Sequence, residues 1–399
     1  MQYFFILGNN PTLSFAEIVS VLKLKPEQVL FLSEKAIIAD VREELDVQKM
    51  IRRLGGTIKV GIVSQKSKVK SHKEILNLID NSKINGKFNF GISYYGSGKL
   101  KNEKQLAMEI KKALKEKRIS SRWVTSRDEQ LSSVVVEQNK LITDKGVEIV
   151  IINDNGNFYI GKTLAVQPFK ELSKRDYGRP GRDDRSGMLP PKLAQILINL
   201  SRGKTNENIL DPFCGSGTVL TEAILMGYQK LIGYDSSEKA ISDTKANIEW
   251  TKENWVGTGQ CPVPVVKICD ARELSKEIKP DFIDTIIAEP YLGPSRMSRD
   301  RSTIEKVVKE LEQLYHEAIL EFEKVLKQQG RIVMIWPVFR VDNDNIMLNT
   351  KNILKYSSFE IINPLKDFDY KVLKLTNRNT IIYGREGQKV WREIVILEK

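Results

Sequence analysis

The octapeptide at residues 211–218, with the sequence DPFCGSGT, is the part of the chain best suited to bind a ligand. Gly215 and Gly217 have no Cβ, so the backbone there can come close to a bound molecule. No lysine follows the last glycine, which excludes a P-loop, and Leu220 replaces the third glycine of a dinucleotide fingerprint. The motif therefore indicates a ligand-binding turn of another class, and a purely structural turn is the alternative.

An acidic residue stands at the end of the next predicted strand. Asp235 closes the segment Gly233-Tyr234-Asp235, where a carboxylate can accept hydrogen bonds from both hydroxyls of a ribose. The same side chain could also cap the following helix, and the two roles are compatible. Asp235 therefore extends the predicted ligand site to a second strand.

The composition favours some classes of protein and argues against others. The net charge of +12 favours a polyanionic partner such as a nucleic acid, although a solvated basic surface would give the same balance. Three cysteines without a CxxC pair, and two histidines far from the motifs, argue against a metal site and a disulfide framework. No stretch approaches the ~20 apolar residues of a membrane helix, and the first residues lack a secretion signal. We therefore expect a soluble, cytoplasmic protein without a metal.

The motifs lie in a region where strands and helices alternate. Strands are expected at 208–210, 231–234, 263–269, 282–288 and 331–336, and helices at 192–200, 218–226, 239–250 and 304–327. A final hairpin is expected from 380–383 and 390–397. Repeated βα units that end in an antiparallel hairpin predict a doubly wound α/β sheet, with ligands at the carboxyl ends of its strands.

Two α+β segments precede this region. The first begins with a strand at 3–7 and a helix capped by Ser14, and it continues in the strand-helix-strand-strand-helix-strand order of a ferredoxin-like domain. The second has helices expected at 72–81 and 102–117, with a strand at 88–95 between them. A stretch rich in Arg, Asp, Gly and Pro then predicts a linker, which is either solvated or a hinge that contacts phosphate.

The octapeptide resembles the cofactor-binding loop of amino-group methyltransferases of the Rossmann class. The resemblance implies a class I fold with a seven-stranded sheet and S-adenosylmethionine as the cofactor. It assigns Asp270 to the adenine amino group and Ala271 to a backbone donor. The cofactor-binding residues are then Asp211, Pro212, Phe213, Cys214, Gly215, Gly217, Thr218, Asp235, Ser236, Asp270 and Ala271.

The segment Glu289-Pro290-Tyr291-Leu292 resembles the (Asp/Asn)-Pro-Pro-(Tyr/Phe) motif of the same enzymes. In that motif a side-chain oxygen and a backbone carbonyl orient an exocyclic amine and localise its lone pair. An aromatic residue stacks on the flipped base. Glu289 is one methylene longer than the usual residue, and Tyr291 is shifted by one position. These four residues are the predicted catalytic residues, and a degenerate, inactive site is the alternative.

The whole chain resembles the tRNA guanosine N2-methyltransferase family that carries a THUMP domain. The similarity lies at residues 3–22, 132–150, 161–166, 179–180 and 188–200. It implies a ferredoxin-like domain at 1–70, a THUMP RNA-binding domain at 71–166, a linker at 167–190 and a Rossmann-like methyltransferase domain at 191–399. The implied RNA-binding residues are Lys101, Lys104, Lys111, Lys112, Lys115, Arg179 and Arg182, although each could instead belong to a solvated face.

The resemblance implies methylation of the exocyclic N2 amine of a guanosine in tRNA, typically at position ten. The partner is then tRNA, with no role for a metal or a membrane, and a monomer is compatible with the chain. A DNA adenine or cytosine amino-methyltransferase shares the catalytic motifs, but the THUMP-like half disfavours it. A third hypothesis is an RNA-binding protein whose site no longer turns over, which the sequence Glu289-Pro290-Tyr291 keeps open.

Overall fold

The computed structural model describes residues 1–67, 75–79, 84, 86–96, 100, 102–182, 188–256, 262–294, 300–341 and 344–399. The chain forms two compact units. The first contains Met1–Phe15 and Leu24–Phe169, and the second contains Ala16–Lys23 and Lys170–Lys399. Half of the helix predicted at 72–81 lies outside the described residues, as do Lys101, Arg185 and Cys261.

The first unit is built on one eight-stranded sheet with the order β2-β3-β1-β4-β8-β7-β5-β6. Its strands are β1 (Gln2–Leu7), β2 (Val29–Leu32), β3 (Ala36–Asp40), β4 (Thr57–Ser67), β5 (Phe88–Tyr95), β6 (Ser121–Val124), β7 (Gly146–Asp154) and β8 (Asn157–Val166). Its helical elements are the start of α1 (Pro11–Leu22, of which the part from Ala16 on belongs to the second unit), the 3-10 turn η1 (Pro26–Gln28), α2 (Val47–Arg53), α4 (Glu103–Glu116) and α5 (Ser133–Gln138). The sheet therefore combines strands from both predicted N-terminal segments, and the domain division at residue 70 stays a prediction.

The element order predicted for the first segment is present, with one correction at the start of α1. Ser14 does not cap this helix, because α1 begins at Pro11 and the side chain of Asn10 accepts from the backbone of Leu13 at 3.0 Å. Proline in the first turn is favourable, since its missing N–H would have no helical partner. The Ser14 hydroxyl instead donates to the carbonyl of Gly56 at 2.7 Å and so joins α1 to the start of β4.

A buried ion pair crosses the middle of this sheet. Lys59 of β4 pairs with Glu148 of β7, and both side chains are almost fully buried. Ser93 of β5 and Thr163 of β8 donate to the same carboxylate at 2.5 and 2.6 Å. Because a buried charge is costly unless it is paired and hydrogen-bonded, these four side chains favour the observed alignment of four neighbouring strands.

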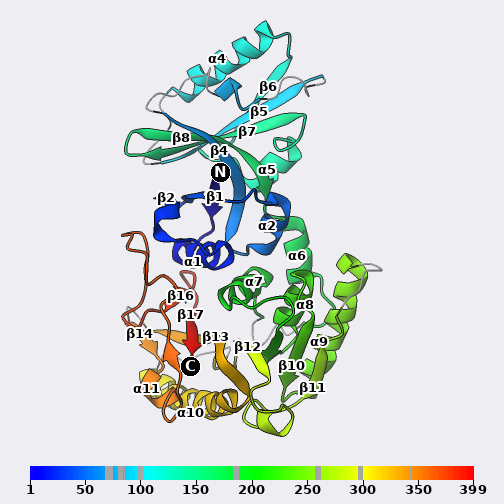
Figure 1. Ribbon diagram of the computed structural model, residues 1–399, viewed down its shortest axis with the longest axis vertical. Coiled ribbons are helices and arrows are strands. Elements are labelled where there is room, and N and C mark those ends of the chain that lie inside the picture. Colours follow the sequence, from blue (N-terminus) through cyan, green and yellow to red (C-terminus); the bar gives the residue numbers. More distant parts are fainter. Residues whose placement is uncertain are drawn as a thin grey trace. The chain divides into compact units, whose positions relative to one another are not determined.

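The second unit contains a nine-stranded sheet, and its main path has seven strands in the order β11-β10-β9-β12-β13-β17-β15 (Figure 1). The strands are β9 (Asn208–Asp211), β10 (Lys230–Asp235), β11 (Val265–Ile268), β12 (Ile283–Ala288), β13 (Leu326–Val341), β14 (Asp344–Met347), β15 (Glu360–Ile361), β16 (Ile381–Tyr383) and β17 (Val390–Glu398). The first five pair with one another in parallel, and β17 runs antiparallel to β13.

The predicted doubly wound α/β fold with a seven-stranded path and a final hairpin is therefore confirmed, and β14 pairs with β13 beside this path. The helices of the unit are α6 (Phe169–Tyr177), α7 (Pro191–Leu200), α8 (Thr218–Leu225), α9 (Glu238–Thr251), the π-helical turn η3 (Lys252–Val256), the 3-10 turn η4 (Leu274–Lys276), α10 (Arg301–Val325) and α11 (Thr350–Ile353). The apolar face of α10, with residues such as Tyr315 and Phe322, packs on β12 and on β13, which contributes Trp336. Among the described residues, no helix is both long and apolar enough to span a bilayer.

The segment predicted as an irregular linker contains helix α6. Arg175 on this helix is buried, and its guanidinium donates to both carboxylate oxygens of Glu222 on α8 at 2.7 and 3.1 Å. Gln195 of α7 donates to the same carboxylate at 2.9 Å. Leu172 is the only apolar residue that this short helix buries. The stability of α6 therefore comes from this polar contact, and the helix cannot be recognised from an apolar periodicity in the sequence.

Candidate active site

A cavity of about 470 Å³ opens at the carboxyl ends of the parallel strands in the second unit. The ends of β9, β10, β11 and β12 contribute to its wall, as expected for an α/β sheet. Every predicted cofactor and catalytic residue except Gly217 lines it. These lining residues are Asp211, Pro212, Phe213, Cys214, Gly215, Thr218, Asp235, Ser236, Asp270, Ala271, Glu289, Pro290, Tyr291 and Leu292.

The glycine-rich loop is fixed from behind by α9. The hydroxyl of Thr244 donates to the carbonyl of Gly215 at 2.7 Å, and the amide of Asn247 donates to the carbonyl of Ser216 at 2.8 Å. Gly217 does not line the cavity; it is the N-cap residue of α8, has a left-handed backbone and lies against Thr244. The loop is therefore held in one shape before any ligand binds, and a preformed loop lowers the entropic cost of binding.

The two glycines of this loop offer a matched test of that arrangement. Both have positive φ, but a Cβ on Gly215 would meet no atom within 4 Å, whereas one on Gly217 would lie 2.9 Å from Thr244 Cγ2. We expect Gly215→Ala to lower the free energy of unfolding by about 1 kcal/mol, the cost of a left-handed alanine. Gly217→Ala should lower it further, by about 2 kcal/mol in all, because Thr244 must move as well. Urea unfolding measures both, and equal losses would contradict the tight contact.

Carboxylates line the cavity along successive strands. Asp235 accepts from the backbone of Gly215 at 3.0 Å and of Ser237 at 2.9 Å, so it joins the end of β10 to the glycine loop. Each oxygen retains a lone pair that can accept from a ribose hydroxyl. Hydrogen bonds from the guanidinium of Arg272 hold the pKa of Asp270 below its usual range. Burial raises the pKa of Asp211 well above its usual value, although the backbone of Phe213 donates to it.

The segment Glu289–Leu292, here called the acceptor loop, takes part in an ion pair that the sequence analysis did not find. Arg392 of β17 donates from Nε to Oε1 of Glu289 at 2.6 Å, and both side chains are largely buried. Burial raises the pKa of Glu289, and the charge of Arg392 opposes that rise. Within the described part of the chain, no donor contacts Oε2 of Glu289, so this oxygen can accept from a ligand in the cavity.

The backbone of the same loop is fixed by α10. The hydroxyl of Tyr315 donates to the carbonyl of Tyr291 at 2.8 Å, and burial raises the pKa of Tyr315 well above 10. The carbonyl of Pro290 accepts from no described residue and remains as a second acceptor beside Glu289. Tyr291 is 54% exposed and lines the cavity, so it has room to stack on a planar ligand. Its stacking role stays a prediction.

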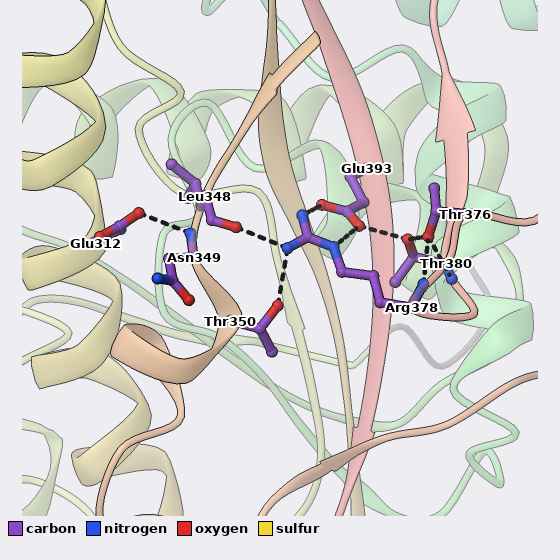
Figure 2. A network of polar contacts seen from close by, with 8 residues as sticks. All are labelled: Glu312, Leu348, Asn349, Thr350, Thr376, Arg378, Thr380 and Glu393. Atoms are coloured by element: carbon purple, nitrogen blue, oxygen red, sulfur yellow. Dashed lines mark hydrogen bonds and ion pairs between the residues drawn. The ribbon is translucent and has the colours of Figure 1, made fainter.

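A buried polar network holds the strand that carries Arg392 (Figure 2). The next residue, Glu393, is fully buried and binds the guanidinium of Arg378 and the hydroxyl of Thr380. Arg378 also donates to the carbonyl of Leu348 at 2.7 Å and the hydroxyl of Thr350 at 2.8 Å. Because successive residues of a strand point to opposite faces, anchoring Glu393 on one face fixes Arg392 on the other.

Cys214 is a wall residue rather than a nucleophile. Its thiol is buried and lies 3.8 Å from the hydroxyl of Thr244. Burial raises the pKa of the thiol far above its ordinary value, so the reactive thiolate is not available near neutral pH. The described residues contain no cluster of three His, Cys, Asp or Glu side chains placed to hold a metal ion.

The predicted RNA-binding residues have different surroundings. Lys104, Lys111, Lys112 and Lys115 are all exposed on α4, and their role in RNA binding stays a prediction. Arg182 donates to the carbonyl of Tyr177 at 2.7 Å, and its role also stays a prediction. Arg179 is 5% exposed and donates to Thr218 at 2.5 Å, so it does not lie on an exposed face, and its predicted role in RNA binding also stays a prediction.

The seven-strand path and a ligand cavity at its carboxyl edge define a Rossmann-class protein, and family comparisons identify which class it is. Residues 179–351 match a family described as RMKL-like, methyltransferase domain. Residues 17–246, more than half of the chain, match a family described as DNA methylase of the N6/N4 type. The chain therefore belongs to this methyltransferase family, which confirms the predicted class of enzyme.

Similar proteins agree with this class. The tRNA (guanine(10)-N2)-dimethyltransferase of Methanothermobacter thermautotrophicus is 32% identical over 192 residues, which are 47% of this chain and 49% of the relative. The protein of the same name from Methanocaldococcus jannaschii is 31% identical over 199 residues, 48% of this chain and 49% of the relative. The chain thus spans about half the length of these relatives. TrmN from Thermus thermophilus has the same fold, with a TM-score of 0.54 and 16% identity over 100% of both chains.

Proposed function

We propose that the protein transfers a methyl group from S-adenosylmethionine to the exocyclic N2 amine of a guanosine in tRNA, at a position equivalent to ten. The observation that carries the proposal is that one cavity is lined by two sets of hydrogen-bond acceptors, each suited to a different ligand. Asp235 and Asp270 offer acceptors for an adenosine, and Glu289 and the Pro290 carbonyl offer acceptors for an amine. The cofactor, when bound, supplies an electrophilic methyl group on its sulfonium.

The residues of the acceptor loop explain how a weak nucleophile could react. An exocyclic amine delocalises its lone pair into the ring, and two acceptors on its hydrogens localise that pair toward the methyl group. Oε2 of Glu289 and the carbonyl of Pro290 are the two described acceptors. After transfer the nitrogen carries one proton too many, and the raised pKa of Glu289 makes Oε2 a better proton acceptor than an ordinary carboxylate.

The carboxylate at this position fits guanine. Guanine presents two neighbouring donors, N1–H and the N2 amine, and an ionised carboxylate accepts through both of its oxygens. Adenine instead presents an unprotonated N1 beside its amine, which a carboxylate oxygen repels. The names of the relatives, tRNA (guanine(10)-N2)-dimethyltransferases, support the same base and the same class of nucleic acid.

The basic face of α4 provides a test of tRNA binding. Leu106, Ile110 and Leu114 are buried on one side of this helix, and the exposed lysines lie on the other. Replacing Lys111 and Lys115 together with glutamine should weaken tRNA binding several-fold and reduce the slope of log K against log salt by about one per lost phosphate contact. Gel-shift titrations at several salt concentrations measure this slope. The matched control replaces Lys35 and Lys145, which are exposed elsewhere on the first unit; an equal effect there would contradict a specific role for α4.

A second candidate, a DNA amino-methyltransferase, is favoured by the description of the family that covers residues 17–246. The third, an RNA-binding protein without turnover, rests on the departures at Glu289 and Tyr291. Incubation with a donor carrying a labelled methyl group, unmodified tRNA and duplex DNA separates the three. We expect label in tRNA alone; label mainly in DNA supports the second candidate, and tRNA binding with no label supports the third.

A further inference from the structure

Arg179 is a buried cation next to the cavity, and no acidic side chain in the described part of the chain is paired with it. Its Nη1 donates to the hydroxyl of Thr218 at 2.5 Å, and its Nη2 lies 3.1 Å from Sδ of Met188. Its Nε is buried and has no hydrogen-bond partner, and none of the described carboxylates forms an ion pair with the guanidinium. Thr218 and Met188 both line the cavity, so the guanidinium lies directly behind the cavity wall.

The contrast with Arg175, four residues earlier on α6, shows what Arg179 lacks. Arg175 is equally buried, but its charge is neutralised by two hydrogen bonds to Glu222. Burial lowers the pKa of Arg179, with only longer-range help from Asp176 and Glu222. A buried charge without a partner is destabilising, and a ligand that supplies an anion at this place would relieve that cost.

The cavity has no other cation to offer an anionic ligand among the described lining residues. Lys239 is paired with Asp243 at 2.5 Å, and Arg272 is paired with Asp270 at 2.7 Å. The remaining charged groups in the wall are acids, which repel a carboxylate: Asp211, Asp235 and Glu289. Asp211 itself is buried without a cationic partner among the described residues. Within the described residues, the cavity wall therefore has a carboxylate without a cationic partner, Asp211, and a guanidinium behind it without an acidic partner, Arg179. A zwitterionic ligand would complement both groups.

The position of Arg179 fits the amino-acid end of the methyl donor. Strand order places Asp270, Asp235 and the glycine loop in succession along the sheet edge. An adenosine held by Asp270 and Asp235 therefore leaves the rest of the molecule over the loop and the first residue of α8, Thr218. We propose that Arg179 binds the α-carboxylate of S-adenosylmethionine, with Asp211 facing its ammonium group. This inference rests on the proposed function, because it requires that donor.

Two ligands that differ only in the amino-acid part test the proposal. S-adenosylhomocysteine carries the α-carboxylate and ammonium, and 5′-methylthioadenosine keeps the adenosine and sulfur without them. Calorimetric titration should show that the wild-type protein binds the first ligand more tightly. Arg179→Met should weaken binding of S-adenosylhomocysteine roughly ten- to a hundredfold, the worth of a hydrogen bond between charged groups. It should change binding of methylthioadenosine by less than about twofold, because the lost contact is absent from that ligand.

Lys239→Met is the matched control, since it removes a cavity-lining cation that already has a partner. It should weaken both ligands by the same small factor. Arg179→Lys keeps the charge and should show a smaller, equally selective loss; this variant gives the same comparison if the methionine variant does not fold. The tRNA affinity of both Arg179 variants should equal that of the wild type.

Three results would overturn the proposal. Equal losses for the two ligands would show that Arg179 only supports the fold, and no loss for either would show that it does not reach the ligand. Equal binding of both ligands by the wild-type protein would remove any role for the amino-acid part while leaving the proposed function intact. Binding of neither ligand by the folded wild-type protein would refute the proposed function and this inference together.

Discussion

Replacing Glu289 with alanine is expected to slow methyl transfer to tRNA roughly a hundred- to a thousandfold, the usual effect of removing one preorganised polar group from a reacting centre. The substitution removes the carboxylate of Glu289 from the cavity wall, including the acceptor Oε2, and leaves the cation of Arg392 without its partner. A cation repels the positive charge that develops on the amine during transfer. The single-turnover rate at saturating tRNA measures the effect, and the affinity for S-adenosylhomocysteine should change little.

Two conservative variants identify which property of Glu289 matters. Glu289→Gln keeps an acceptor oxygen but loses the charge, and we expect a loss smaller than that of alanine. Glu289→Asp restores the residue usual in this motif, but it is one methylene short of Arg392 and should also be slower than the wild type. If the alanine variant retains the wild-type rate, Glu289 does not orient the amine, and the acceptor assignment is wrong.

Replacing Arg392 with methionine is expected to lower the free energy of unfolding by about 3 kcal/mol near neutral pH. The variant leaves the buried carboxylate of Glu289 without its cation, and breaking one side of a buried pair has this order of cost. Arg340→Met is a suitable control, because Arg340 lies on the neighbouring strand β13 and its guanidinium contacts an exposed asparagine, Asn345. Urea unfolding of both variants measures the difference, and equal losses would contradict a special role for Arg392.

The same variant should shift the pH dependence of the reaction. Burial already raises the pKa of Glu289, and Arg392 opposes that rise, so its removal should raise the pKa further. The reaction needs the ionised carboxylate; the rate therefore falls as the pH drops through this pKa, and the fall should begin at higher pH in Arg392→Met. Stability changes in the opposite sense. The folded state binds the extra proton, so the stability deficit of the variant should shrink as the pH is lowered. An unchanged acid limb would show that Glu289 does not control the rate.

The parts of the site that could be predicted from sequence are those made by contiguous residues. The loop at 211–218 and the segment 289–292 each follow a predicted strand directly, so their place at a strand end could be predicted, and each lies there in the structure. The alternation of strands and helices after residue 190 was equally predictable, because buried parallel strands give clear apolar runs.

The partners of these loops could not be predicted, because they are distant in sequence. Arg392 is 103 residues from Glu289, and only the antiparallel return of β17 brings it to the acceptor loop. Thr244 and Asn247 occupy an ordinary helical pattern, and their contacts to the glycine loop depend on how α9 packs. The family resemblance placed Arg179 among the RNA-binding residues, and the sequence does not show that tertiary packing buries it beside Thr218.

Identification of the methylated nucleoside tests the central proposal most directly. Unmodified tRNA is incubated with the protein and a donor that carries an isotope-labelled methyl group, and the RNA is then digested to nucleosides and analysed by mass spectrometry. We predict label in N2-methylguanosine or N2,N2-dimethylguanosine from the tRNA, and its near disappearance with Glu289→Ala. Label in N6-methyladenosine, or in DNA in preference to tRNA, would contradict the assignment of guanine N2 as the acceptor.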